Sequence, residues 1–273
     1  MNADTGPLLD FGGRTPYLDY QSIDTLLSLQ HPRSTEPAEL SFYVVGQVKE
    51  LLFKLLYEES CRARALLDQD EPGRATRVLH RVRKVVDLLV SCWDVLSTLT
   101  PQEFNAFREH LGQASGVQSY MYRMVEYVLG NKNPALARPH DQPAEVAEAV
   151  RSALRSPSLY DAAVALLARR GAPVPTDILT RDPAVPHAPS PAVEQAWRAV
   201  YADAPPEAEL PRLGEALMDL AEGMSRWRAL HLLTVERIIG TKPGTGGTCG
   251  ASWLRRVNEH RFFPELWAAR TLL

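Results

Sequence analysis

The sequence predicts an all-α protein, and three observations lead to that prediction. Several long segments place apolar side chains at the three-and-four spacing of a half-buried helix. No segment of useful length shows the apolar–polar alternation of a strand, and no internal repeat stands out. Helix start signals such as Thr100-Pro101-Gln102-Glu103 separate the segments. This pattern favours a helical bundle.

The composition is that of an ordinary globular protein. Its 273 residues are 45% hydrophobic and 23% charged, with a formal net charge of −3 and no long basic run, which argues against a nucleic-acid partner. No charged-then-apolar leader follows Met1 and no apolar run is long enough to cross a bilayer, so no membrane is expected. Cys61, Cys92 and Cys249 lack CxxC spacing and cannot all pair, which predicts free thiols and a cytoplasmic location.

The N-terminal 14 residues are rich in Gly, Pro and Asp and are predicted to be loosely held, whereas residues 15–273 are predicted to form a single domain. A short helix carrying Tyr17 and Tyr20 is expected next. From the residues alone, this segment is an amphipathic helix with two surface tyrosines.

A helix of many turns is predicted after Pro37. Its apolar stripe, expected to be mostly core, comprises Phe42, Val45, Val48, Leu52, Leu55 and Leu56. Gly46 lies within this helix, where glycine costs roughly 1 kcal/mol relative to alanine. Such a residue makes most sense where another group must approach the backbone closely.

The second long helix is predicted from about Arg74 to Leu99. Its stripe comprises Val78, Val82, Val85, Val86, Leu89, Cys92, Trp93 and Leu96. Thr100 and Glu103 then form a capping box for a helix in which Arg108 lies one turn after Phe104, on an otherwise apolar side. An unpaired charge there is costly, so Arg108 must find an anion. A structural carboxylate and a ligand carboxylate are equally open as its partner.

Residues 135–210 are predicted to be an excursion from the bundle. The preceding helix closes at Gly130-Asn131. The excursion is rich in Ala, Pro and Arg, with residues 157–171 as its one clear helix and a proline-rich loop from Gly171 to Pro191. A last long helix is predicted over residues 213–239, and residues 262–267 are expected to pack the C-terminus back.

The stretch from Ser225 to Trp253 is the most distinctive. Its helix has an apolar side formed by Leu230, Leu233, Val235, Ile238 and Ile239. His231 lies within this helix, where its ring can point inward. Gly240 ends the helix, and Gly244-Thr245-Gly246-Gly247 can bring N–H groups and a hydroxyl up to a ligand. On these residues alone, a core histidine is more common than a metal ligand, and one glycine-rich loop is weak evidence.

Several pieces of the chain, in order, resemble the tryptophan 2,3-dioxygenase family. They are YLDYQSIDTLLSLQ, FYVVGQVKELLFKLL, LTPQEFNAFREHLGQASGVQS, GNKNP, and WRALHLLTVERIIG followed by GTGG. The resemblance covers about Tyr17 to Leu273 and is poorest in the middle. It implies an all-α bundle that binds b-type haem. It also implies a homotetramer in which the N-terminal segment covers the substrate of a neighbouring subunit.

The resemblance also implies roles for individual residues. His231 is the implied axial ligand of ferrous haem iron, whose other side is open to O2. The other residues expected beside the haem are Trp93, Ser115, Gly116 and Val235. Arg108, with Thr245 and Gly244 of the glycine-rich loop, is expected to bind the carboxylate and ammonium of a tryptophan-type amino acid. The expected walls around the indole are Phe42, Phe104, Leu111, Tyr17 and Tyr20.

Three positions depart from the family's pattern. Gly46 stands where the family has a histidine that accepts a hydrogen bond from the indole N–H. Phe104 replaces a tyrosine whose hydroxyl assists the carboxylate, and Val117 replaces a phenylalanine. One neutral hydrogen bond is worth only about 1 kcal/mol, so binding can survive its loss while orientation changes. Gly46 is therefore expected, with Ser115 and Gly116, to shape catalysis.

Three functions remain open. The space beside Gly46 and the missing hydroxyl at Phe104 suit a substrate such as β-methyltryptophan, and favour insertion of one oxygen atom to give a 2-oxindole. Cleavage of the indole ring to N-formylkynurenine is the alternative. A non-catalytic protein that binds haem and an indole amino acid is the third, but the persistence of Arg108, Thr245 and His231 argues against it.

Overall fold

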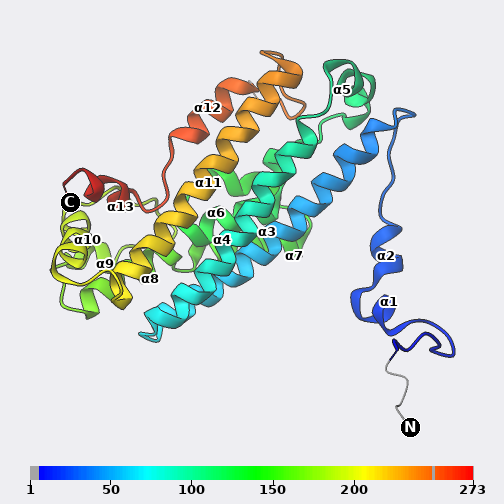
Figure 1. Ribbon diagram of the computed structural model, residues 1–273. Coiled ribbons are helices and arrows are strands. Elements are labelled where there is room, and N and C mark those ends of the chain that lie inside the picture. The colour runs from blue at the N-terminus through cyan, green and yellow to red at the C-terminus, as the bar shows by residue number, and fades with distance from the viewer. Residues whose placement is uncertain (1–5, 248–249, 273) are drawn as a thin grey trace, which may run out of the picture.

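The computed structural model describes residues 6–247 and 250–272, and within them it contains helices and no strand. Three long helices run alongside one another: α3 (Ala38–Asp68), α4 (Pro72–Leu96) and α11 (Glu209–Ile239) (Figure 1). A turn over residues 69–71 joins α3 to α4, and α11 packs along α4. The prediction of an all-α bundle is confirmed.

The remaining helices cover the ends and one side of this layer. The two N-terminal helices are α1 (Pro16–Gln21) and α2 (Ile23–Leu27). Between α4 and α11 lie α5 (Pro101–Arg108), η1 (Glu109–Leu111), η2 (Gly116–Gln118), α6 (Tyr120–Leu129), η3 (Pro134–His140), α7 (Ala144–Arg155), α8 (Leu159–Arg169), α9 (Thr176–Leu179) and α10 (Pro191–Asp203). After α11 come α12 (Ala251–Glu259), α13 (Pro264–Ala269) and η4 (Arg270–Leu272).

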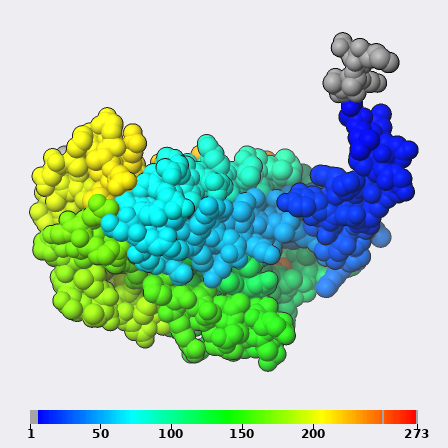
Figure 2. Space-filling view, turned by 90° about the horizontal axis from the view of Figure 1, so that it is seen from below, coloured from blue at the N-terminus to red at the C-terminus, as the bar shows by residue number. Residues whose placement is uncertain are grey.

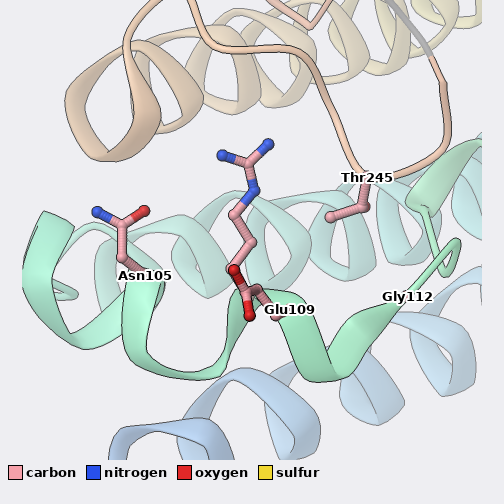
Figure 3. Close-up of a pocket in the computed structure, with 5 residues that line it drawn as sticks. Asn105, Glu109, Gly112 and Thr245 are labelled. Carbon is pink, nitrogen blue, oxygen red and sulfur yellow. The ribbon is translucent and has the colours of Figure 1, made fainter.

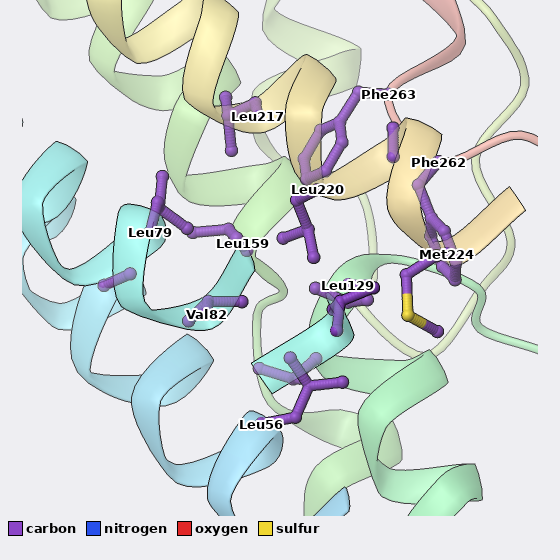
Figure 4. Close-up of a cluster of buried hydrophobic side chains, with 14 of the residues drawn as sticks. Leu56, Leu79, Val82, Leu129, Leu159, Leu217, Leu220, Met224, Phe262 and Phe263 are labelled. Atoms are coloured by element: carbon purple, nitrogen blue, oxygen red, sulfur yellow. The ribbon is translucent and has the colours of Figure 1, made fainter. Parts of the chain in front are cut away.

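One main core joins the long helices to the shorter ones. Its side chains interdigitate between α3, α4, α6, α8 and α11, and two phenylalanines before α13 close it (Figure 4). The labelled members are Leu56, Leu79, Val82, Leu129, Leu159, Leu217, Leu220, Met224, Phe262 and Phe263. Every residue of the stripe predicted for α4 is buried. The expected capping box also forms, with the Thr100 side chain accepting from the Glu103 N–H and Glu103 Oε2 accepting from the Thr100 N–H.

The segment 135–210 contains more structure than the single helix expected from its sequence. Besides α8, it includes α7 and α10, and α9 interrupts the stretch that was expected to be a loop. Val193 and Trp197 of α10 belong to the main core together with Leu159. The prolines therefore separate short helices instead of excluding them, because proline is well tolerated in the first turn of a helix.

The apolar face expected for α3 is partly wrong. Val48 and Leu55 are 39% and 43% exposed, whereas Phe53 and Leu56 are buried against the core. Leu233 of α11, expected on the apolar side, is likewise 60% exposed. Apolar residues occur on more than one side of these helices, so periodicity alone does not decide which side faces the bundle.

The N-terminal arm stands away from the bundle. Helices α1 and α2 project beyond the body of the protein (Figures 1 and 2). Arg14 links the two helices of this arm, because it donates a hydrogen bond to Asp24 of α2 at 2.6 Å and forms an ion pair with Asp19 of α1. Of the N-terminal stretch expected to be loosely held, residues 1–5 lie outside the described residues, and residues 6–14 form no helix.

Two expectations from composition can be compared with the described part of the chain. No helix in residues 6–247 and 250–272 is both long and apolar enough to cross a membrane. Cys61 and Cys92 are free thiols, as expected, and Cys249 lies outside the described residues.

Candidate functional site

His231 lies on α11 at the level where α4 presents Trp93. The imidazole stacks on the Trp93 ring, with the centroids 4.5 Å apart and the planes 14° from parallel. Trp93 is buried, and the Trp227 ring lies 6.0 Å from the imidazole. Burial, and secondly the positive charge of Lys49, lower the pKa of His231 to about 3. The imidazole is therefore neutral near pH 7, which is the form that binds metal ions.

Two indole N–H groups and one ammonium group lie near His231. The indole Nε1 atoms of Trp93 and Trp227 are buried without a hydrogen bond in the described structure. Lys49 of α3 has its Nζ 4.5 Å from the centroid of the Trp93 ring. Unpartnered buried donors are uncommon in folded proteins, so their clustering marks a place where another polar group belongs.

The backbone of α3 is open at Gly46. A Cβ atom built at this position would meet no described atom within 4 Å. One turn earlier on α3, Phe42 packs against Phe104 and Phe107 of α5, at centroid distances of 5.9 and 5.4 Å. The space expected beside Gly46 is therefore present, and an aromatic cluster borders it along α3.

Arg108 lies at the C-terminal end of α5 beside a hollow of about 530 Å³. The hollow is lined by Asn105, Arg108, Glu109, Gly112 and Thr245, with Thr245 lying across from α5 and η1 (Figure 3). One terminal nitrogen of Arg108 donates to the Pro243 carbonyl. Within residues 6–247 and 250–272, no carboxylate lies within 4.0 Å of the guanidinium. Among the described residues a structural carboxylate is therefore not its partner, and the guanidinium can bind an anion from outside.

Two loops form the far wall of this hollow. The Thr245 hydroxyl donates to the Ala114 carbonyl at 2.6 Å, which fixes the loop after α11 against the loop before η2. A Cβ atom at Gly246 would lie 2.5 Å from the Cβ of Ser115, so only glycine allows this approach. The Ser115 N–H in turn donates to the side chain of Gln118 at 3.1 Å.

The structure brings most of the predicted residues together, in two groups. His231 and Trp93 form one group, with Val235 half-buried one turn further along α11. The second group consists of Arg108, Thr245 and Ser115 with their loops; it also includes Gly244, which is partly buried, and Gly116, which is exposed. Phe42, Phe104 and Leu111 are partly buried and pack against the main core.

Tyr17 and Tyr20 are the exception. They are 66% and 87% exposed on the N-terminal arm, which stands away from the bundle of the same chain (Figure 1). The structure therefore places neither tyrosine in the site of its own chain.

Three residues near these groups were not predicted from the sequence. Asn105 and Glu109 line the hollow beside Arg108. They lie one turn before Arg108 and directly after it, a spacing that could have indicated them. Lys49 follows Gly46 by three residues and therefore shares its side of α3, but a lysine in a helix is usually a solvent-exposed residue.

Comparison with known proteins gives one consistent result. The family model described as tryptophan 2,3-dioxygenase matches residues 1–273. The chain is similar to a protein of that name from a Polaromonas species, with 46% identity over 263 residues, which is 96% of this chain and 90% of the relative. It is also 46% identical to one from Bordetella pertussis, over 96% of this chain and 93% of the relative. A Bacillus cereus protein of the same name is 44% identical over 97% of this chain and 95% of the relative.

Proposed function

The chain belongs to the tryptophan 2,3-dioxygenase family, and on this premise we propose that it is a haem-dependent oxygenase that uses O2 on the indole ring of a tryptophan-type amino acid. The observation that supports this most directly is a neutral imidazole at His231 combined with an Arg108 guanidinium that has no carboxylate partner in the described structure. The first suits a metal and the second suits an amino-acid carboxylate.

A b-type haem fits the residues around His231. The neutral imidazole would hold the iron, and the buried indole N–H groups of Trp93 and Trp227 offer donors to the polar edge of the haem. When bound, a haem supplies the one-electron and O2 chemistry that amino-acid side chains lack. The chain would contribute the neutral imidazole of His231 and, beside Arg108, a defined place for the substrate.

The hollow beside α5 suits the zwitterionic end of an amino acid. Arg108 can present a planar pair of donors to a carboxylate, and the Thr245 hydroxyl lies in the same wall. The carboxylate of Glu109 lines the hollow as well, which suits an ammonium group. These three side chains would fix the amino-acid end and thereby orient the indole, which is how a protein promotes the chemistry of a cofactor.

Ring cleavage to N-formylkynurenine is the outcome that the comparisons favour, because the relatives are named tryptophan 2,3-dioxygenase. A specific observation supports a second candidate, the insertion of one oxygen atom to give a 2-oxindole, in which an external two-electron reductant and two protons convert the other oxygen atom to water. Gly46 has no side chain to accept a hydrogen bond from the indole N–H, and the space beside it is open. That space suits a β-methylated tryptophan, whose extra methyl group needs room.

Isotope labelling distinguishes these reactions. The haem-loaded, reduced protein is incubated with tryptophan or β-methyltryptophan under ¹⁸O₂, with and without an excess of an external two-electron reductant, and the product is analysed by mass spectrometry. Two labelled atoms identify ring cleavage, and one labelled atom identifies the 2-oxindole. Tight binding of the amino acid without a product would contradict the proposed catalysis. In the same preparation, His231→Ala should abolish the Soret band, and Arg108→Leu should weaken substrate binding at unchanged haem content.

We further propose that copies of this chain assemble, with the N-terminal arm of one copy covering the site of another. Helix α3 has an exposed apolar stripe, which comprises Leu40, Val44, Val48, Leu51 and Leu55. Contiguous exposed apolar surface of this kind is typical of protein interfaces. Light scattering measures the assembly, and mixing Tyr20→Ala with Arg108→Leu subunits should restore activity if sites are shared. We also propose a cytoplasmic location, because the free thiols of Cys61 and Cys92 suit a reducing compartment.

A further inference from the structure

Lys49 approaches the stacked rings of Trp93 and His231 from the side of α3. It follows Gly46 by three residues, so both lie on the same side of the helix. Its Nζ lies 4.5 Å from the centroid of the Trp93 ring, the same ring on which the His231 imidazole stacks. The ammonium group therefore lies next to the pair of rings that the proposed function assigns to the haem.

This ammonium group has no anionic partner in the described part of the chain, where no carboxylate lies within 4.0 Å of it. Glu50 is adjacent in sequence, but burial raises the pKa of its carboxyl group, and its hydrogen-bond partner is Ser119. Burial also raises the pKa of the nearby Cys92 thiol, which is therefore neutral. Lys49 is partly buried, and burial lowers the pKa of its ammonium group while the neighbouring Cys92 and Glu50 act in the opposite direction. An anion bound beside Lys49 would favour the charged form.

A second donor without a partner belongs to the same ring. The Nε1 atom of Trp93 is buried and makes no hydrogen bond in the described structure. The ammonium group of Lys49 thus lies over a ring whose own N–H makes no hydrogen bond in the described structure. A carboxylate satisfies both, because it is anionic and its two oxygens accept several hydrogen bonds.

The geometry of the two rings indicates where such a carboxylate belongs. A metal bound to an imidazole nitrogen lies in the plane of the imidazole ring, and the Trp93 ring is within 14° of parallel to that plane. Trp93 therefore flanks the line from the imidazole to the metal and does not block it. Lys49, which lies over Trp93, is to the side of this line, where it could hold a carboxylate of a bound haem.

We propose that Lys49, with the indole N–H of Trp93, binds a propionate carboxylate of the haem, an inference that rests on the proposed binding of haem at His231. Lys49 is then a haem-positioning residue. Its charge holds one edge of the macrocycle beside α3, on the same side of the helix as the open backbone of Gly46. Removing the charge should loosen this edge without removing the axial ligand.

The test compares haem with its dimethyl ester, in which both propionates are neutral. Haem-free protein is titrated with each porphyrin, and the dissociation constants are measured by Soret absorbance. The protein should bind haem at least tenfold more tightly than the ester. Lys49→Met keeps the aliphatic stem but removes the charge, so it should lose most of this preference, whereas Lys49→Arg should retain it. Lys54→Met is the matched control, because Lys54 is exposed on the same helix and should have no effect.

The outcomes separate this inference from the proposed function. Tight binding of haem with equal affinity for the ester overturns the role of Lys49 and leaves the haem protein intact; this measurement needs no variant. A preference that persists in Lys49→Met overturns it as well. If Lys49→Met alters the axial ligation seen by electron paramagnetic resonance, Lys49 binds the iron, which also contradicts the proposal. Failure to bind either porphyrin overturns the proposed function and this inference together.

Discussion

Replacing Gly46 by alanine is expected to make the haem-free protein more stable. Gly46 lies inside α3, and an added Cβ would meet no described atom within 4 Å. Glycine inside a helix costs about 1 kcal/mol relative to alanine, so Gly46→Ala should raise the free energy of unfolding by about that amount. For a chain of this length, the corresponding rise in Tm is about 2 °C.

Gly223 provides a matched control in the interior of α11. The gain in helix propensity is the same there, but an added Cβ would lie 2.8 Å from Cγ1 of the buried Val86. Overpacking a core of this kind costs about 1–3 kcal/mol. Gly223→Ala should therefore range from no change to a loss of about 2 kcal/mol in the free energy of unfolding.

Urea unfolding followed by far-ultraviolet circular dichroism measures both variants at one protein concentration. The urea midpoint of Gly46→Ala should rise. The urea midpoint of Gly223→Ala should fall or stay unchanged. If Gly46→Ala destabilises the haem-free protein, the space beside α3 is not open and the argument for a site shaped around Gly46 fails.

The methyl group added by Gly46→Ala should weaken substrate binding in the haem-loaded protein. With haem and substrate bound, the Cβ at position 46 would occupy space that the ligands need. Gly46→Ala should therefore raise the KM for β-methyltryptophan more than the KM for tryptophan. An equal effect on both substrates would show that the β-methyl group does not lie beside α3.

Three further predictions concern the loops and the buried charges. Gly246→Ala should weaken binding of the amino acid, because its Cβ would lie 2.5 Å from that of Ser115, and adding Ser115→Gly to the same chain should restore binding measured by calorimetry. Glu126→Gln should lower the free energy of unfolding in urea by about 3 kcal/mol, because the carboxylate accepts from the buried Arg228 at 2.7 Å and the guanidinium would lose its counter-charge; a loss below about 1 kcal/mol would contradict this. Burial lowers the pKa of His187 from 6.5 to about 4, so the folded state binds fewer protons than the unfolded state within that window, and stability should fall as the pH drops through it. His187→Gln should flatten this pH dependence of urea unfolding, and an unchanged slope would show that His187 does not contribute.

Local sequence patterns were sufficient to predict burial and capping wherever the apolar residues of a helix lie on a single face. The stripe of α4 was predicted residue by residue, because its apolar side chains occupy a single face, and the capping box at Thr100 depends only on residues three apart. The roles expected of His231 and Arg108 came from resemblance to a family, and the structure added that the His231 imidazole is neutral and that no carboxylate among the described residues pairs with Arg108.

The sequence by itself determined the long helices, their order and the family, because periodicity, capping and motifs are local properties of the chain, whereas it did not predict α7, α9 and α10. Only the tertiary structure decided which side of α3 is buried, since apolar residues occur on more than one side of that helix. It also decided that Tyr17 and Tyr20 lie outside the site of their own chain, and that Lys49 lies over Trp93. Such contacts join residues far apart in the sequence. No spacing along one helix encodes them, because they depend on how the helices pack against one another.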